Sequence, residues 1–163
     1  MSYSDVEPLR ASFRPIKVKV LFVGESAPAG GDFFYKGTGQ VHREFQRALS
    51  PTIGATPSFL GAFMAAGMYL DDLVLEPVNW LSRSQRNAMH SNNVPSLAGR
   101  IKEYQPLAVI AFMKAIRRPV EEAVVASGCS CAVQTVSFPG NGRQADFRTE
   151  MAAILPEVLE LAE

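Results

Sequence analysis

Cysteine is scarce in this sequence, because Cys129 and Cys131 are the only two among 163 residues. Two cysteines cannot build a disulfide framework, and a structural zinc site or an iron–sulfur cluster usually needs four ligands. We interpret the pair as small apolar side chains at the edge of a strand. The sequence therefore predicts a protein without a metal site and without a cofactor.

Long hydrophobic runs are also absent. No window approaches the roughly 20 apolar residues of a membrane span, and residues 1–15 contain no apolar stretch typical of a signal peptide. We therefore expect a soluble, cytoplasmic protein with no membrane partner. Charge of one sign is not in excess either, since 16 lysines and arginines balance 16 aspartates and glutamates. Net charge thus neither favours nor disfavours an anionic partner.

Two common catalytic motifs are missing. The chain contains no Gly-Lys-Ser/Thr, which excludes the usual phosphate-binding loop of nucleoside triphosphatases. Ser26 follows an apolar run, but Pro28 stands where the Gly-x-Ser-x-Gly elbow of α/β-hydrolases requires glycine. A Ser-His-Asp hydrolase is therefore disfavoured. We expect the two histidines, His42 and His90, to lie at the surface.

Apolar and polar segments alternate along the chain. The apolar runs predict strands at residues 18–23, 69–78, 107–113 and 132–138, and the amphipathic segments predict helices at residues 41–49, 95–104, 119–128 and 147–161, with Pro156 kinking the last. This order predicts one α/β domain over residues 1–163, with residues 1–15 as an N-terminal extension. The expected architecture is a three-layer α/β/α sandwich with a four-stranded parallel sheet.

Ligands of such a sheet bind at the carboxyl ends of its strands. Basic side chains follow all four predicted strands, where acidic ones are few. They are Lys36 after the first strand, Arg83 and Arg86 after the second, Lys114, Arg117 and Arg118 after the third, and Arg143 after the fourth. A basic rim of this kind suits a phosphate-bearing partner, although any one of these side chains could simply be a solvated loop residue.

Two motifs far apart in the chain carry a resemblance to a known family. Gly-Glu-Ser-Ala-Pro at residues 24–28 ends the first predicted strand, and Phe-Pro-Gly-Asn-Gly at residues 138–142 ends the last. Together with Tyr-Leu-Asp-Asp-Leu-Val at residues 69–74, they resemble motifs of the uracil-DNA glycosylase superfamily, over about residues 17–150. The resemblance implies the α/β/α fold of that superfamily. It also implies a DNA-repair enzyme that flips a base out of DNA and hydrolyses its N-glycosidic bond without a metal.

The resemblance implies roles for individual residues. Glu25 and Ser26 would be catalytic, with Glu25 holding a water molecule or facing the sugar cation that forms as the bond breaks. The base would be bound by Gly24, Ala27, Pro28, Phe34, Tyr35 and Asp72. DNA would be bound by Lys36, Arg83, Arg86, Phe138, Pro139, Gly140, Asn141, Gly142 and Arg143.

Three positions differ from the usual residues of the superfamily. Ser26 stands where the most efficient members have aspartate, Phe138 where most have histidine, and Asp72 where many have an asparagine that reads the base. A carboxylate accepts from N3–H of uracil but repels its O4 carbonyl, whereas an amide can satisfy both. Two alternatives to a monomeric base-excision glycosylase therefore stay open. One is a nucleic-acid or nucleotide-binding module that has lost the chemistry, and the other is a protein that binds a phosphate-bearing metabolite.

Aromatic side chains near these motifs have two interpretations. Phe33, Phe34 and Tyr35 could stack on a base, or some of them could fill the core beneath the loop. Trp80 could stack on nucleic acid beside Arg83, but we expect it in the core.

Overall fold

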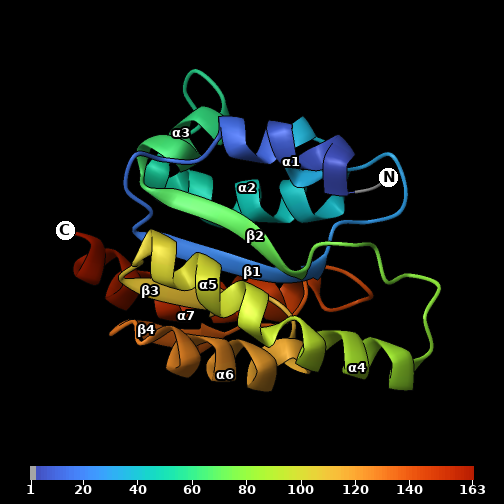
Figure 1. The fold of residues 1–163 in the computed structure, drawn as a ribbon. Coiled ribbons are helices and arrows are strands. Elements are labelled where there is room, and N and C mark those ends of the chain that lie inside the picture. The colour runs from blue at the N-terminus through green and yellow to red at the C-terminus, as the bar shows by residue number, and fades with distance from the viewer. Residues whose placement is uncertain (1–2) are drawn as a thin grey trace.

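A four-stranded, all-parallel sheet forms the middle layer of the computed structural model, which describes residues 3–163 (Figure 1). The strands are β1 (Val20–Ser26), β2 (Met68–Val74), β3 (Ala108–Ala111) and β4 (Ala132–Thr135), in the spatial order β2-β1-β3-β4. The apolar side chains at the start of β1 and throughout β3 are fully buried, as expected for central strands that are covered on both faces.

Helices cover both faces of the sheet (Figure 1). One side holds α1 (Tyr3–Ser12), α2 (Gly39–Ile53) and α3 (Phe59–Ala65), and α2 also contacts α7 (Gln144–Ala162). The other side holds α4 (Arg83–Asn92), α5 (Val94–Tyr104) and α6 (Arg117–Ser127), with α5 packed on α6. Short 3₁₀ turns follow β1 (η1, Phe34–Lys36) and β3 (η2, Lys114–Ile116). The predicted α/β/α sandwich with a parallel sheet is confirmed. Within residues 3–163, no helix combines the length and apolar character needed to cross a membrane.

An aromatic cluster fills the core beneath the end of β1. Phe22 of β1 packs against Phe45 of α2 and Phe63 of α3, with ring centroids 5.2 and 5.8 Å apart. Phe34 of η1 joins the same cluster, 5.5 Å from Phe45. Edge-to-face and stacked contacts of this kind stabilise a fixed arrangement of rings. The loop after β1 is therefore anchored to the core at η1.

Several element boundaries differ from the sequence-based predictions. β1 continues to Ser26, which pairs with Val74 of β2, so the motif at residues 24–28 begins inside a strand. β2, β3 and β4 end earlier than expected. Pro119 occupies the third position of α6 rather than the first, and α7 runs through Pro156 as one continuous helix.

Two helices lie where an N-terminal extension and a loop were expected. α1 forms within residues 1–15, which we had interpreted as an extension, and it buries Val6 and Arg10 in the fold. α4 forms where a polar loop was expected, because its sequence has few apolar residues to mark a buried face. Both helices turn out to reach the candidate site.

Candidate active site

A cavity of about 360 Å³ opens at the carboxyl edge of the sheet. This volume lies in the range of pockets that bind small molecules. Each strand contributes to its wall, since Glu25 lies near the end of β1, Asp72 lies in β2, Phe112 follows β3 and Phe138 follows β4. The cavity therefore occupies the place at which parallel α/β sheets bind ligands.

The carboxylate of Glu25 is held by two side chains of α4. Arg86 donates from Nη2 to Oε1 and from Nε to Oε2, the latter over 3.3 Å, and Nε2 of His90 lies 2.8 Å from Oε2. A carboxylate can only accept hydrogen bonds, so this nitrogen of His90 is a donor. Burial alone would raise the pKa of Glu25, but hydrogen bonds from His90 and Arg86 and the charge of Arg86 hold that pKa below its ordinary value. Glu25 is thus an anion at neutral pH.

The start of α4 is fixed by local hydrogen bonds. Ser82 and Gln85 form a capping box, in which Oγ of Ser82 accepts from the N–H of Gln85 over 3.2 Å and the side chain of Gln85 accepts from the N–H of Ser82 over 2.9 Å. Arg86 and His90 are four positions apart, so they project from the same face of this helix. The capped helix therefore presents both donors to Glu25.

Aromatic side chains give the cavity an apolar wall. Phe34 is almost completely buried, and its ring is fixed by Phe63, 5.3 Å away between centroids, as well as by Phe45. Phe112 is also buried and packs on Phe45 at 5.1 Å, while Phe138 is only half-buried. Phe34, Phe112 and Phe138 line the cavity together with Phe33. A planar ligand would meet aromatic surfaces there.

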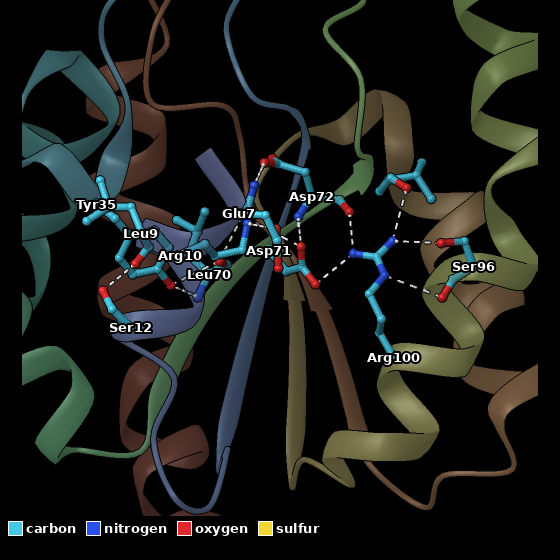
Figure 2. Close-up of polar contacts among 11 residues, drawn as sticks. Glu7, Leu9, Arg10, Ser12, Tyr35, Leu70, Asp71, Asp72, Ser96 and Arg100 are labelled. Atoms are coloured by element: carbon cyan, nitrogen blue, oxygen red, sulfur yellow. Dashed lines mark hydrogen bonds and ion pairs between the residues drawn. The ribbon is translucent and has the colours of Figure 1, made fainter. Parts of the chain in front are cut away.

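Asp72 supplies a second carboxylate and pairs with Gly24 across β1 and β2. The packing around Gly24 is tight, because an added Cβ would lie 2.5 Å from Cζ of Phe112 and 2.7 Å from Oδ1 of Asp72. Nη2 of Arg10 donates to Oδ2 of Asp72 over 2.9 Å (Figure 2). Burial raises the pKa of Asp72, whereas the charge of Arg10 opposes that rise.

The cavity brings together most of the residues predicted to act on a base. Glu25 and Ser26 line it, together with Gly24, Ala27, Pro28, Phe34 and Asp72. Tyr35 does not line the cavity. Its buried hydroxyl accepts from the N–H of Leu70 over 2.6 Å and donates to the carbonyl of Leu70 over 2.9 Å. Tyr35 therefore supports the edge of β2 instead of stacking on a ligand.

The residues predicted to bind DNA fall into three groups. Arg86, Phe138 and Asn141 line the cavity itself. A second hollow of about 300 Å³ shares Phe138 and Asn141 with the cavity and adds Gly140 and Arg143 to its lining. The others lie outside both hollows: Lys36, Arg83 and Gly142 are exposed, and Pro139 is buried.

Much of the expected basic rim is paired with acidic side chains. Arg117 pairs with Glu121, Arg118 with Glu122, Arg143 with Asp146 and Lys114 with Glu150. Such exposed pairs are weak, so a phosphate group could compete for these cations. Lys36 and Arg83 form no ion pair within residues 3–163. Fewer unpaired positive charges are therefore available to a phosphate than the sequence suggests.

Three expectations about side-chain burial are wrong. His42 and His90 were expected at the surface, but they are 8% and 5% exposed. The ring of His42 packs against Phe34 and Phe59, and His90 is held by Glu25. Trp80 was expected in the core but is 70% exposed.

Several contributors to the site were not identified from the sequence. Arg10, His90, Asn79 and Phe112 lie beside or in the cavity wall. The spacing of Arg86 and His90 and the Ser82-x-x-Gln85 cap could have indicated α4, but the burial of Arg10 has no local signal.

Metal ligands are not grouped in the described part of the chain. No three His, Cys, Asp or Glu side chains of residues 3–163 could hold an ion together. Cys129 and Cys131 are half-buried free thiols, and burial, with the neighbouring Cys129, raises the pKa of Cys131 to about 12. No family model matches this chain, and no curated protein matches it.

Proposed function

We propose that the protein is a DNA glycosylase that hydrolyses the N-glycosidic bond of a deaminated or damaged base. The observation that carries the proposal is the ionised carboxylate of Glu25, held by Arg86 and His90 in the wall of an aromatic cavity. A flipped base is planar and apolar on its faces, and its hydrolysis requires charge stabilisation beside it.

The position of Glu25 fits the charges of this reaction. As the bond between C1′ and the base nitrogen breaks, positive charge develops on the sugar and negative charge on the base. Glu25 would stabilise the sugar cation. Among the residues that the structure describes, its Oε1 accepts only from Arg86, so a second lone pair is available to orient a water molecule. Because its pKa is lowered, Glu25 is a weak base and suits this electrostatic role better than complete proton removal.

The bonds and protons of the step balance without a further reactant. The oxygen of water forms a bond to C1′, and the electrons of the C1′–N bond leave with the base. The proton released by the water neutralises the base. Ser26 lines the cavity and its Oγ makes no hydrogen bond with residues 5–163, so this hydroxyl could donate a hydrogen bond to the departing base.

The cavity also fits the other requirements of a flipped base. Phe34, Phe112 and Phe138 offer surfaces against which a base could stack. The second hollow lies beside the cavity and carries Lys114 and Arg143 in its lining. These cations would meet the phosphates that flank the flipped nucleotide.

A second candidate function is a binding module of the same fold that performs no hydrolysis. One observation favours it, because the charge of Glu25 is already neutralised by Arg86. Phe138 also supplies no proton donor at the position where the resembled superfamily has histidine. Such a protein would bind a base or nucleotide in the cavity and release it unchanged.

An assay of base release separates the two functions. Short single-stranded and duplex oligonucleotides, each with one uracil, hypoxanthine, xanthine or oxidised base, are incubated with excess protein and treated with alkali. Scission at one lesion, lost in Glu25→Gln and retained in Glu76→Gln, supports the glycosylase. Glu76 is the matched control because it is exposed and lies outside the cavity. No scission by folded protein across the panel overturns the proposal, and retained binding would then favour the module.

A further inference from the structure

The free edge of β2 is covered by two arginines from different helices. Arg10 of α1 is 1% exposed, and its Nη1 donates to the carbonyl of Leu70 over 3.1 Å. Arg100 of α5 donates from Nη1 to the carbonyl of Asp72 over 2.8 Å. Figure 2 shows both guanidinium groups directed at the two consecutive aspartates of this strand. These contacts satisfy two carbonyl groups on the outer edge of β2.

The two aspartates differ in how their oxygens are used. Asp71 engages both oxygens, because Oδ2 lies 2.7 Å from Nη1 of Arg100 and Oδ1 accepts from the N–H of Asp72 over 2.8 Å. Asp72 engages only Oδ2, which accepts from Arg10. Two guanidinium groups and two carboxyl groups thus face one another, and Asp72 forms its ion pair with Arg10.

The second oxygen of Asp72 faces the cavity. Oδ1 accepts no hydrogen bond from residues 5–163, although the side chain is only 6% exposed. No completely buried polar side-chain atom of the described residues lacks a partner, so Oδ1 must reach open space. That space is the cavity, because Asp72 lines it and Oδ1 lies beside Gly24.

We propose that Asp72 is a specificity-determining residue that selects a base carrying an exocyclic amino group, and that Arg10 positions it by holding Oδ2. The inference rests on the proposed function in one respect, namely that the cavity receives a base. It narrows the substrate class from any deaminated or damaged base to a damaged base that keeps its amino group.

The chemistry of a carboxylate explains the selection. Oδ1 can accept a hydrogen bond but cannot donate one. The imide N–H of an oxo base such as uracil is flanked by two carbonyl oxygens. When this N–H donates to Oδ1, the carbonyl oxygens lie close to the carboxylate and are repelled by it. An amino group can donate to Oδ1 without placing a carbonyl there. A buried polar site rejects a ligand that leaves its groups unpaired, and discrimination of about ten- to a hundredfold is ordinary for one such contact.

Binding of free bases tests this inference without requiring turnover. Cytosine and uracil form one amino/oxo pair of probes, and adenine and hypoxanthine form another. Each is titrated into the full chain while the backbone amide resonances of Gly24 and Ala27 are followed by NMR. The wild-type protein should bind the amino member of each pair at least about tenfold more tightly. In Asp72→Asn, an amide nitrogen should face the cavity, so the preference should disappear or invert.

Asp71→Asn is the matched control. It removes the same charge from the same network, but its oxygens contact Arg100, Arg10 and backbone, and Asp71 does not line the cavity. This variant should be less stable yet keep the wild-type preference. If Asp72→Asn alone does not fold, the double variant Arg10→Met/Asp72→Asn removes both charges of the pair. It should lose the preference for amino bases.

The outcomes separate this inference from the proposed function. Equal or tighter binding of the oxo bases by the wild-type protein overturns the inference, as does an equal change in Asp71→Asn and Asp72→Asn. Absence of binding by all four bases also overturns it. If the protein cleaves DNA at an oxo lesion and also binds oxo bases more tightly, the glycosylase proposal holds and only the role of Asp72 is rejected. If it binds amino bases more tightly but cleaves at no lesion, the role of Asp72 holds in a binding module that performs no hydrolysis.

Discussion

Glu25 and Arg86 are joined by two hydrogen bonds although they stand 61 positions apart in the chain. One ends a central strand, and the other lies on a helix that begins only after the β2 strand. The pair therefore forms one wall of the cavity and keeps the carboxylate of Glu25 ionised. The protonation of Glu25 should be visible in the pH dependence of the protein's stability.

Acid should remove the stabilisation that Glu25 provides. Its pKa is lower in the folded protein than its ordinary value of 4.5, so the unfolded chain binds this proton more readily. The contribution is complete above pH 4.5 and is lost as pH falls through the lower folded-state pKa. The free energy of unfolding of wild type minus Glu25→Gln, measured by urea denaturation from pH 7 downward, should be constant and then shrink in acid. A difference that grows on acidification would contradict the ion pair.

Loss of Arg10 should destabilise the protein strongly. In Arg10→Met, the buried carboxylate of Asp72 loses its guanidinium partner, whereas Asp71 keeps Arg100, and removal of one partner costs about 3–5 kcal/mol for comparable buried pairs. Urea denaturation at neutral pH measures the change. The control is Arg118→Met, whose ion pair with Glu122 is exposed and should contribute nothing measurable. Equal stability of both variants would mean that α1 does not hold β2 through Arg10.

A methyl group at Gly24 should disturb the cavity from within the strand. Its Cβ would lie 2.5 Å from the ring of Phe112 and 2.7 Å from Oδ1 of Asp72, so these side chains must move. Overpacking of this kind costs about 1–3 kcal/mol, and ligand binding in the cavity should weaken as well. Denaturation and the base titrations measure both effects. Gly31→Ala is the control, because nothing lies within 4 Å of its added Cβ. A Gly24→Ala protein with wild-type stability and binding would contradict the tight packing described here.

The alternation of strands and helices along the chain, and the edge of the sheet at which a ligand is expected, could be predicted because they depend on local patterns. Apolar runs marked β1 and β3, and the rule that ligands bind at the carboxyl ends of parallel strands indicated the edge at which the cavity opens. The roles of Glu25 and Asp72, which line this cavity, were implied by the family resemblance of their motifs and not by this rule. The type of each main element was therefore accessible from sequence, whereas its ends were less so.

The remaining features depend on contacts between distant segments. α4 has mostly polar residues, so hydrophobic periodicity could not mark it, and the burial of His90 follows from its bond to Glu25. Arg10 is buried because two aspartates of β2 neutralise its charge. The sequence around residue 10 contains no pattern that predicts this burial. Tyr35 was expected to face a base, but its hydroxyl finds both of its partners at the edge of β2.

The most direct test of the central claim is the single-turnover rate of base release by the wild-type protein and by Glu25→Gln. The substrate is the oligonucleotide that the lesion panel identifies, with protein in excess. We expect the variant to bind this DNA as the wild type does and to release the base at least about a hundredfold more slowly, because one preorganised electrostatic group contributes that much. A Glu25→Gln protein that releases the base at the wild-type rate would show that the ionised carboxylate at the end of β1 does not carry the reaction.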